Sequence, residues 1–508
     1  MSRLNELVKN IGSNWIAFAT SVLTAFFLSP FIVHHLGNTA YGVWTLVISL
    51  ISLLGLLDLG MRGAITRFVS RNHAQGNHEE ASRAVSAGLW LRLWIAFLIV
   101  AISAVLSALA PVILHIPPEL QLAARWAMLL VGASFALTLA CGVFGGVLVA
   151  LNRFTYVSGL TVAQTLLRAV GVVWLLSSGR GILSLAIWEF AVAVLINFTL
   201  LVLSSRTYPQ LRISLKKPDP ELFRQFVSYS FYVFIINCAT VAIYYTDNLV
   251  VGTFVSAAAV TFYSIGGSIL QYLRQTVTSV TTIFMPLASG LEARGEHSEL
   301  RRLLVQGTRF TLFISMPIAL TLYFRGHTFI GLWMGPQYAP VSGQIVQILL
   351  LAQVFSIANF TSGNIAYGMA KHRPFAIAVL AESIANLALS ILLVLRIGMT
   401  GVAWGTVIPN LVIQLFFWPR YICRLLEMPV RSYLWQSWAR PVLATVPFGV
   451  ACYLTDLHWG ATHLLQFFLQ IVAILPLLLL GFLACFWKEI VWQLESRWGG
   501  WSKLFFRK

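Results

Sequence analysis

Long apolar stretches, separated by short polar segments, follow one another along almost the whole chain. A helix of about 20 apolar residues is long enough to cross the hydrocarbon core of a bilayer, which is roughly 30 Å thick. Fourteen stretches have a suitable length and composition: residues 12–35, 41–57, 84–108, 122–151, 160–176, 182–203, 226–252, 260–286, 310–324, 341–366, 375–395, 401–418, 442–457 and 464–487. The pattern predicts an all-α integral membrane protein with about 14 transmembrane helices, of which the ninth is short.

The composition excludes a set of soluble domains. Of the 508 residues, 58% are hydrophobic and only 10% are charged, too few to cover the surface of soluble domains of that total size. The five cysteines are scattered and indicate neither a disulfide framework nor a metal site. Glu6 interrupts a weakly basic start and no small-residue cleavage site follows, so we expect the first span to remain in the mature protein.

The excess of basic residues follows the predicted topology. The chain has 34 Lys and Arg against 17 Asp and Glu, a net charge of +17. With the N-terminus in the cytoplasm, 27 basic residues lie on the cytoplasmic side, three outside (Arg180, Arg325 and Arg396) and four within spans. Because Lys and Arg collect in cytoplasmic loops, this asymmetry predicts an even number of spans with both termini in the cytoplasm. It accounts for the positive charge without a nucleic-acid partner.

Two loops carry the same short pattern at an offset of 219 residues. Residues 76–88 (GNHEEASRAVSAG) and 295–307 (GEHSELRRLLVQG) are identical at five of 13 positions, which we interpret as an internal repeat of six spans. Since six is even, the repeat predicts two six-helix lobes related by a pseudo-twofold axis along the membrane normal. The predicted domains are residues 1–215, residues 216–430, and residues 431–508, the last with two further helices and a cytoplasmic interfacial tail.

Polar residues recur every three or four positions on the predicted spans seven and eight, as expected of helices that line a water-filled cavity. The stripe on span eight consists of Tyr263, Gly267, Gln271, Arg274, Thr278 and Thr281. The stripe on span seven consists of Ser230, Asn237, Thr240, Tyr244 and Asp247. A cavity between the lobes would hold the substrate, and the predicted substrate-binding residues are Arg274, Gln271, Tyr263, Tyr244, Asn237 and Thr278.

Arg274 lies about 14 residues, or roughly 21 Å, along span eight and is therefore deep in the bilayer. A charge at that depth costs several kcal/mol unless it is paired or hydrated, which marks the residue as a functional candidate. The planar guanidinium matches phosphate oxygens, so we expect Arg274 to bind phosphate. The alternative is a structural pair with a carboxylate or with carbonyl groups at a helix end.

Two acidic residues are candidates for coupling transport to an ion. Asp247 lies within about a turn of the outer end of span seven, where it could titrate, help to hold a sodium ion, or simply be hydrated. Glu382, in the middle of span eleven, is the second candidate. Arg168 and Glu189 lie at similar depth on adjacent spans, and we expect a structural ion pair between them.

A motif in the first 70 residues carries a family resemblance. It consists of Ser29-Pro30-Phe31-Ile32-Val33, Leu36-Gly37, Tyr41-Gly42-Val43-Trp44, Leu56-Leu57-Asp58-Leu59-Gly60 and Thr66-Arg67. The motif resembles the opening of bacterial polysaccharide and O-antigen flippases, in the multidrug/oligosaccharidyl-lipid/polysaccharide exporter superfamily. The likeness in layout extends over the first twelve spans.

The resemblance implies a two-lobed transporter of the bacterial inner membrane. It would move a polyprenyl-diphosphate-linked oligosaccharide to the outer leaflet by alternating access, for polysaccharide or lipopolysaccharide biosynthesis. Its partners would be that lipid-linked glycan, membrane lipids, and a polysaccharide polymerase with other assembly proteins. The family holds its anionic substrate in a cationic cavity, which agrees with Arg274 on span eight. Murein-precursor flippases of the superfamily place several arginines in first-half cavity helices, and spans one and two here have none at mid-depth, so a murein precursor is less favoured.

Two other functions remain open. An ion-coupled multidrug or small-molecule exporter of the same fold would prefer an acidic and aromatic cavity, whereas the deep charge on the clearest stripe is Arg274. A membrane glycosyltransferase or polymerase needs catalytic side chains on substantial external loops, and the longest such loop, around residues 326–340, contains no acid. We expect no catalytic residue, metal or other cofactor, and no segment resembles a nucleotide-binding loop. The energy would come from an ion gradient, the membrane potential or consumption of the product.

Overall fold

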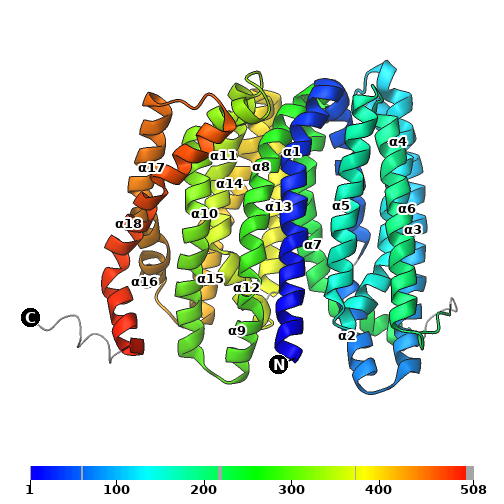
Figure 1. The fold of residues 1–508 in the computed structure, drawn as a ribbon, viewed down its shortest axis with the longest axis horizontal. Helices are drawn as coiled ribbons and strands as arrows, with labels where there is room; N and C mark the ends of the chain where they lie inside the picture. Colours follow the sequence, from blue (N-terminus) through cyan, green and yellow to red (C-terminus); the bar gives the residue numbers. More distant parts are fainter. Residues whose placement is uncertain (1, 59–60, 215–219, 372, 499–508) are drawn as a thin grey trace, which may run out of the picture. The chain divides into compact units, whose positions relative to one another are not determined.

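The computed structural model describes residues 2–58, 61–214, 220–371 and 373–498. Within these ranges every regular element is helical, which confirms the predicted all-α class (Figure 1). The chain forms two compact units: unit 1 comprises Met1–Ser264 and Phe375–Val402, and unit 2 comprises Ile265–Pro374 and Ala403–Lys508. Each unit therefore combines segments that are distant in the sequence.

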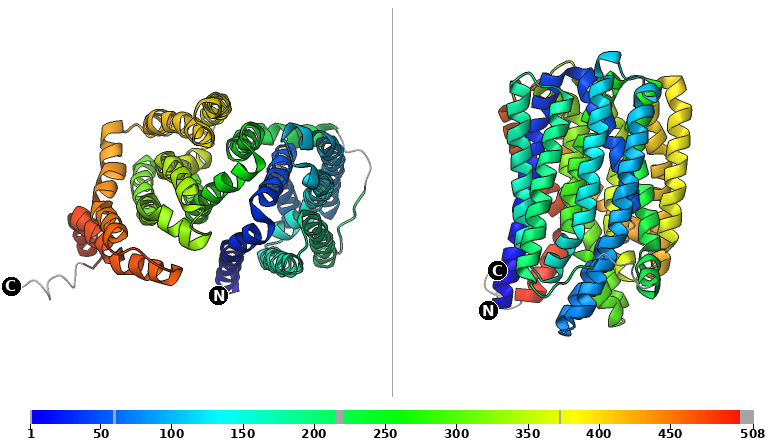
Figure 2. Two further views of the ribbon diagram at one scale, coloured as in Figure 1. Left: turned by 90° about the horizontal axis from the view of Figure 1, so that it is seen from above. Right: turned by 90° about the vertical axis from the view of Figure 1, so that its right-hand side faces the viewer.

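Unit 1 is built from long helices that run side by side. They are α1 (Ser2–Leu53), η1 (Leu54–Asp58), α2 (Met61–Ala74), α3 (His78–Ile113), α4 (Pro118–Ala150), α5 (Phe154–Ser177), α6 (Ile182–Thr207), α7 (Pro220–Phe254), the beginning of α8 (Ala257–Thr281) and most of α13 (Arg373–Ile397). Helix α4 packs against both α3 and α6, and α1 packs against α5 (Figures 1 and 2). Small and branched side chains such as Ala84, Ile99, Val143 and Val147 fill the contact around α3 and α4.

Helix α1 joins the predicted spans one and two in one element of 52 residues, broken at Gly37. Gly37 has φ 75° and ψ 167°, a backbone conformation that only glycine adopts without strain. The external loop expected at residues 36–40 is therefore reduced to this break. The glycine of the Leu36-Gly37 pair is explained by the sharp change of direction that it allows.

Unit 2 contains the remaining elements. They are the rest of α8, α9 (Phe284–Ala293), α10 (His297–Trp333), α11 (Ala339–Ala358), α12 (Phe360–Gly368), most of α14 (Met399–Val412), the π-helical turn η2 (Ile413–Phe417), α15 (Trp418–Leu425), α16 (Val430–Leu434), the π-helical turn η3 (Trp435–Ala439), α17 (Arg440–His458) and α18 (Leu464–Trp498). Helix α10 packs against α11 and α17, and α17 packs against α18. The two helices that follow residue 430 are thus part of this compact unit.

Helix α10 is longer than the predicted ninth span. The apolar run ends near Phe324, but the helix continues to Trp333 across a kink at Arg325 (φ −120°, ψ 15°). The Arg325 side chain is fully buried in unit 2. The assignment of Arg325 to an external loop is therefore wrong, because its charge has partners within the unit that the sequence does not reveal.

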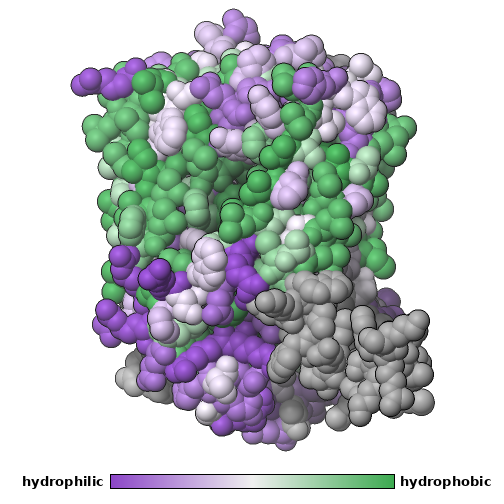
Figure 3. Space-filling model, turned by 90° about the vertical axis from the view of Figure 1, so that its left-hand side faces the viewer, coloured by the Kyte–Doolittle hydropathy of each residue, from purple (hydrophilic) through white to green (hydrophobic). Residues whose placement is uncertain are grey.

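The described part of the chain contains ten segments that are long and apolar enough to cross a membrane. The first, Gly12–Asp58, contains the predicted spans one and two, and the predicted spans seven, eight and thirteen fall on α7, α8 and α17. The face drawn in Figure 3 shows a band of hydrophobic side chains between two hydrophilic ends. The protein is a multi-pass membrane protein.

The two loops of the predicted repeat have the same backbone geometry. Gly76 and Gly295 adopt φ values of 70° and 68°. In each loop the N–H of the histidine two residues further on, His78 or His297, donates to the glycine carbonyl, at 3.1 and 3.0 Å. Each loop joins a short helix to a long one, α2 to α3 and α9 to α10. The local repeat is thus structural, whereas the domain division at residues 215 and 430 remains a prediction.

Candidate functional site

The middle of α8 presents an open polar face. Gln271 and Thr278 are exposed and Arg274 is half-buried, and steps of three and four residues put them on one side of the helix. Gly267 precedes them on the same stripe, and a methyl group added there would have no atom within 4 Å. These residues belong to unit 2, where an accessible guanidinium flanked by an amide and a hydroxyl can donate hydrogen bonds to an anionic, hydroxyl-rich ligand.

Tyr263 has different surroundings from the rest of its stripe. It is buried in unit 1, with 3% of its surface exposed, and its hydroxyl donates to Oδ2 of Asp247 at 2.7 Å. Asp247 is also buried, with 6% exposed, although its position near the end of a span left hydration open. The structure thus joins a predicted substrate-binding residue to a predicted ion-coupling residue. A change at the carboxylate of Asp247 would therefore alter the hydrogen bond that Tyr263 makes.

The other predicted substrate-binding residues of α7 both precede Asp247 in the sequence. Tyr244, one turn before Asp247, is exposed at 44% of its surface. The side chain of Asn237 lies outside the described residues. The roles assigned to Tyr244 and Asn237 in substrate binding stay predictions.

Hydrogen bonds tie α1 to the region around Asp247. Asn248 Nδ2 donates to Ser49 Oγ at 3.1 Å, and Thr261 Oγ1 donates to the backbone oxygen of Asn38 at 2.6 Å. Gly42 makes this approach possible, because an ideal Cβ at that position would lie 1.8 Å from the carbonyl oxygen of Ala257. The sequence did not reveal these contacts, although Gly42 belongs to the motif that carries the family resemblance.

Glu382 is buried in unit 1 on a polar stripe of α13. Its surface is 4% exposed, and Asn386 and Ser390 follow at steps of four residues with 1% and 0% exposed. One turn earlier, Val379 packs with Ile243 of α7, which itself precedes Asp247 by one turn. Both ion-coupling candidates therefore flank the same contact between α7 and α13. The stripe was missed, although its spacing could have revealed it.

Two ion pairs in unit 1 are structural in character. The expected pair of Arg168 and Glu189 is confirmed, with Arg168 Nε donating to Glu189 Oε2 at 2.6 Å. Arg92, with 1% of its side chain exposed, donates at 2.7 Å to Asp58, which ends η1, and at 3.0 Å to the carbonyl of Leu139. The Asp58 of the motif Leu56 to Gly60 thus anchors the end of the first long element to α3 and α4.

Arg325 is held by an equivalent arrangement in unit 2. Its Nε donates to Asp456 Oδ1 at 3.3 Å, its Nη2 donates to Gln470 Oε1 at 2.5 Å, and its guanidinium lies 4.6 Å from the ring centre of Phe467. These contacts attach α17 and α18 to the kink of α10. In the described ranges of the chain no three His, Cys, Asp or Glu side chains gather as metal ligands.

Two solved structures of integral-membrane proteins share this fold. The structure of lipid II flippase MurJ in an inward closed conformation matches with a TM-score of 0.71 and 15% identity, covering 94% of this chain and 100% of that one. A multidrug resistance MATE family transporter in an inward-facing conformation matches with a TM-score of 0.68 and 13% identity, over 81% of this chain and 95% of that one. At these identities the likeness establishes the fold.

The sequence profile of the polysaccharide biosynthesis protein family matches residues 34–343, and the chain belongs to this family. The membrane protein EpsK of Bacillus subtilis (strain 168) is 22% identical over 434 residues, 82% of this chain and 83% of that protein. A protein of Shigella flexneri described as a candidate O-antigen transporter is 20% identical over 403 residues, 78% of this chain and 93% of that protein. The resemblance found in the first 70 residues is thereby confirmed.

Proposed function

We propose that the protein is a flippase that carries a polyprenyl-diphosphate-linked oligosaccharide across the bacterial inner membrane by alternating access. The observation that carries the proposal is the family match over residues 34–343, together with a relative described as a candidate O-antigen transporter. The product would serve polysaccharide or lipopolysaccharide biosynthesis. Both termini would lie in the cytoplasm, as the charge count predicts.

Arg274 supports an anionic lipid-linked substrate. A diphosphate offers several oxygens to the planar donors of a guanidinium, and the half-buried position strengthens the attraction relative to bulk water. Gln271 and Thr278, on the same exposed face, are suited to hydrogen bonds with sugar hydroxyls. We therefore assign diphosphate binding to Arg274 and glycan contacts to Gln271 and Thr278.

The buried acids of unit 1 support an ion gradient as the energy source. Asp247 and Glu382 are 6% and 4% exposed, and a carboxylate buried in a membrane protein is stabilised by binding a proton or a sodium ion. A proton or sodium ion bound to Asp247 would change the carboxylate that accepts the hydrogen bond from the Tyr263 hydroxyl. Ion binding would thereby affect the beginning of α8. Delivery of the glycan to a polymerase and other assembly proteins would complete the cycle by removing the product.

An ion-coupled exporter of drugs or other small molecules is the second candidate. The match to a multidrug resistance transporter and the two buried acids favour it. Arg274 on the open face of α8 opposes it, because a cationic side chain repels the cationic compounds that acidic cavities select.

The deciding experiment compares a deletion strain with a strain that carries the intact gene. Right-side-out and inverted membrane vesicles are treated with an impermeant reagent that modifies exposed glycans, and lipid-linked oligosaccharides are identified by mass. We expect the deletion to trap the lipid-linked oligosaccharide on the cytoplasmic leaflet and the intact chain to restore it to the outer leaflet. An unchanged distribution would contradict flipping and favour small-molecule export.

A further inference from the structure

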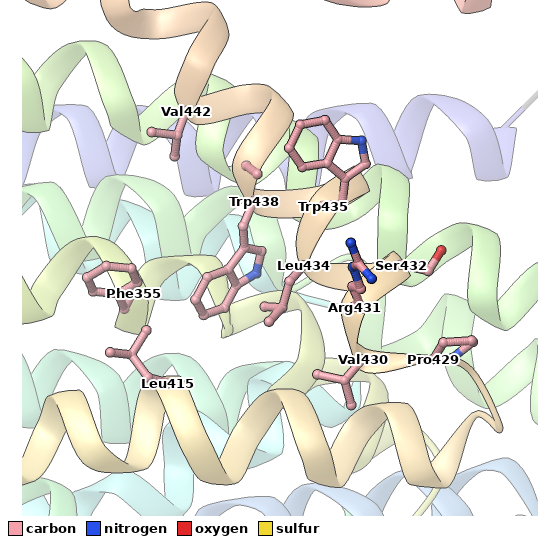
Figure 4. Close-up of a pocket in the computed structure, with 11 residues that line it drawn as sticks. Phe355, Leu415, Pro429, Val430, Arg431, Ser432, Leu434, Trp435, Trp438 and Val442 are labelled. Atoms are coloured by element: carbon pink, nitrogen blue, oxygen red, sulfur yellow. The ribbon is translucent and has the colours of Figure 1, made fainter.

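Unit 2 contains a large groove apart from the polar face of α8. Its volume is about 1150 Å³, and its wall comes from α11, η2, the loop before α16, α16, η3 and α17 (Figure 4). The lining residues are Phe355, Leu415, Pro429, Val430, Arg431, Ser432, Leu434, Trp435, Trp438, Ala439 and Val442. Figure 4 shows the indole of Trp438 between Phe355 and Leu434. Of these residues only Arg431 and Ser432 bring a charge or a hydroxyl.

The polar residues stand at one end of the groove. Arg431 and Ser432 lie in α16, directly after the loop that follows α15, and the charge count assigns this loop to the cytoplasmic side. Val442 follows Arg431 by eleven residues, or roughly 16 Å of helix. The groove therefore runs from the level of the lipid headgroups into the hydrocarbon region. Trp435, which is 57% exposed, stands between the two levels, as interfacial tryptophans do.

The wall of the groove is built in advance of any ligand. Both π-helical turns contribute to it, through Leu415 of η2 and through Trp435, Trp438 and Ala439 of η3. Such turns are rare and occur frequently at functional sites. Behind the wall, Tyr433 is fully buried, and its hydroxyl lies 3.3 Å from Ser362 Oγ and 3.4 Å from Thr308 Oγ1. Burial raises the pKa of Tyr433, so the phenol stays neutral and fixes α16 in place.

The mouth of the groove carries an available positive charge. The ion pairs described in unit 2 join Arg294 to Glu296, Arg301 to Glu427, Arg302 to Glu299 and Arg325 to Asp456. Arg431 is exposed and belongs to none of these described pairs. The basic end of the chain is a poor occupant, because residues 499–508 contain two Lys and one Arg and no acid. A long apolar wall with one cation at the headgroup level complements an anionic amphiphile.

We propose that this groove binds an anionic phospholipid of the inner leaflet, with its phosphate at Arg431 and Ser432 and an acyl chain along the apolar wall. An acyl chain is flexible enough to follow the irregular surface around η3. The guanidinium of Arg431 and the hydroxyl of Ser432 donate to the phosphate oxygens. The bound lipid would contact α11 and η2 on one side and α16 and α17 on the other. The negative charge of its headgroup would favour its binding over that of neutral lipids.

The test measures lipid binding to the purified full-length protein. The protein is delipidated in detergent and titrated with phosphatidylglycerol or with phosphatidylcholine of the same acyl chains, and bound lipids are counted by native mass spectrometry. We expect the first phosphatidylglycerol to bind at a lower concentration than the first phosphatidylcholine. Arg431→Gln should raise the half-saturating phosphatidylglycerol concentration about fivefold, because one basic side chain at the membrane surface contributes about that factor. Arg424→Gln, at an exposed arginine in the last turn of α15, is the matched control and should change nothing.

A second pair of variants tests the apolar wall. Val442 is 40% exposed and lines the groove, so Val442→Trp should fill the space without disturbing the core and should reduce binding of both lipids. Val450, 52% exposed and two turns further along α17, is outside the lining, and Val450→Trp should leave binding intact. Three outcomes would overturn the proposal. The first is equal lipid binding by Arg431→Gln and Arg424→Gln, and the second is a dimer mass that Val442→Trp abolishes. The third is displacement of phosphatidylglycerol by a polyprenyl phosphate whose binding depends on Arg431 in the same way. The dimer result would assign the groove to a second copy, and the displacement result to the carrier lipid of the substrate.

Discussion

The hydroxyl of Tyr263 donates a 2.7 Å hydrogen bond to the carboxylate of Asp247, and both side chains are almost completely buried within unit 1. The bond joins the beginning of α8 to the C-terminal part of α7. A hydrogen bond to a charged group contributes about 1.5 to 3 kcal/mol. Any cation that binds Asp247 therefore acts on α8 through Tyr263, and the proposed substrate residues follow on the same helix.

We predict that Asp247→Asn removes the dependence of glycan transport on the coupling ion, while Tyr263→Phe keeps it. Without the phenolic donor the carboxylate attracts cations more strongly, so the Tyr263→Phe protein should reach its half-maximal rate at a proton or sodium concentration about tenfold lower. The measurement is uptake into proteoliposomes against proton and sodium gradients set independently. An unaltered ion dependence in Asp247→Asn would exclude Asp247 from coupling and leave Glu382 as the candidate.

Arg274 is predicted to be needed for transport and dispensable for folding. Arg274→Ala removes the guanidinium from the open face of α8 and should reduce glycan export at least a hundredfold, since charge-assisted bonds to phosphate contribute about 3 kcal/mol. Arg274→Lys keeps the charge without the planar fork and should retain part of the activity. Arg302→Ala, at an exposed arginine paired with Glu299, is the control for loss of a positive charge. Normal export by a well-expressed Arg274→Ala protein would rule out its role in phosphate binding.

The similar backbone of the two loops at Gly76 and Gly295 could be predicted from the sequence, because the two loops share a sequence pattern. Gly76 and Gly295 share a positive φ, as their equivalence under the repeat requires. The spacing to Gly88 and Gly307, which is the same in both loops, also has a packing reason. A methyl group at Gly88 would meet Ile65 of α2 at 2.7 Å. One at Gly307 would meet Thr361 of α12 at 2.7 Å and Phe284 of α9 at 3.3 Å. Gly88 thus lets α2 pack closely on α3, and Gly307 lets both α9 and α12 pack closely on α10.

Long-range pairs could not be predicted, because nothing in the sequence links residues so far apart. Asp58 and Arg92 are separated by 34 positions, and Arg325 and Asp456 by 131. The apolar pattern predicts that a helix ends where a charged residue appears. A charged residue with buried partners can nevertheless lie inside a helix, as Arg325 does in α10. Arg168 and Glu189 were predictable because adjacent antiparallel spans of similar length bring equal depths together.

Gly42 and Gly267 allow a comparison between a tightly packed glycine of α1 and a glycine on an open face of α8. An ideal Cβ on Gly42 would lie 1.8 Å from the backbone oxygen of Ala257, which cannot move aside as a side chain does. Gly42→Ala should destabilise the protein by about 3 kcal/mol. Gly267→Ala meets nothing within 4 Å in the interior of α8 and should stabilise it by roughly 0.5 to 1 kcal/mol. Melting temperatures in detergent would measure both changes, and equal temperatures for the two variants would show that α1 does not pack on α8 as described.

A buried guanidinium attaches α17 and α18 to α10. The buried guanidinium of Arg325 bonds to Asp456 and Gln470, and Asp456, 28% exposed, also accepts from Thr328 Oγ1 at 2.7 Å. Asp456→Ala leaves a buried cation with only part of its partners. Breaking a buried pair costs about 3 to 5 kcal/mol, and the exposure of Asp456 lowers the expected loss to roughly 2 kcal/mol.

The double variant Arg325→Met with Asp456→Leu removes the charge together with its partner and should recover most of the lost stability, because apolar replacements avoid the desolvation of both ions. The measurement is unfolding of the purified protein by increasing mole fractions of SDS, with Arg396→Met at an exposed arginine as the control. A double variant as unstable as Asp456→Ala would mean that the kink at Arg325 needs the hydrogen bonds of its guanidinium, and that the ion pair contributes little beyond them.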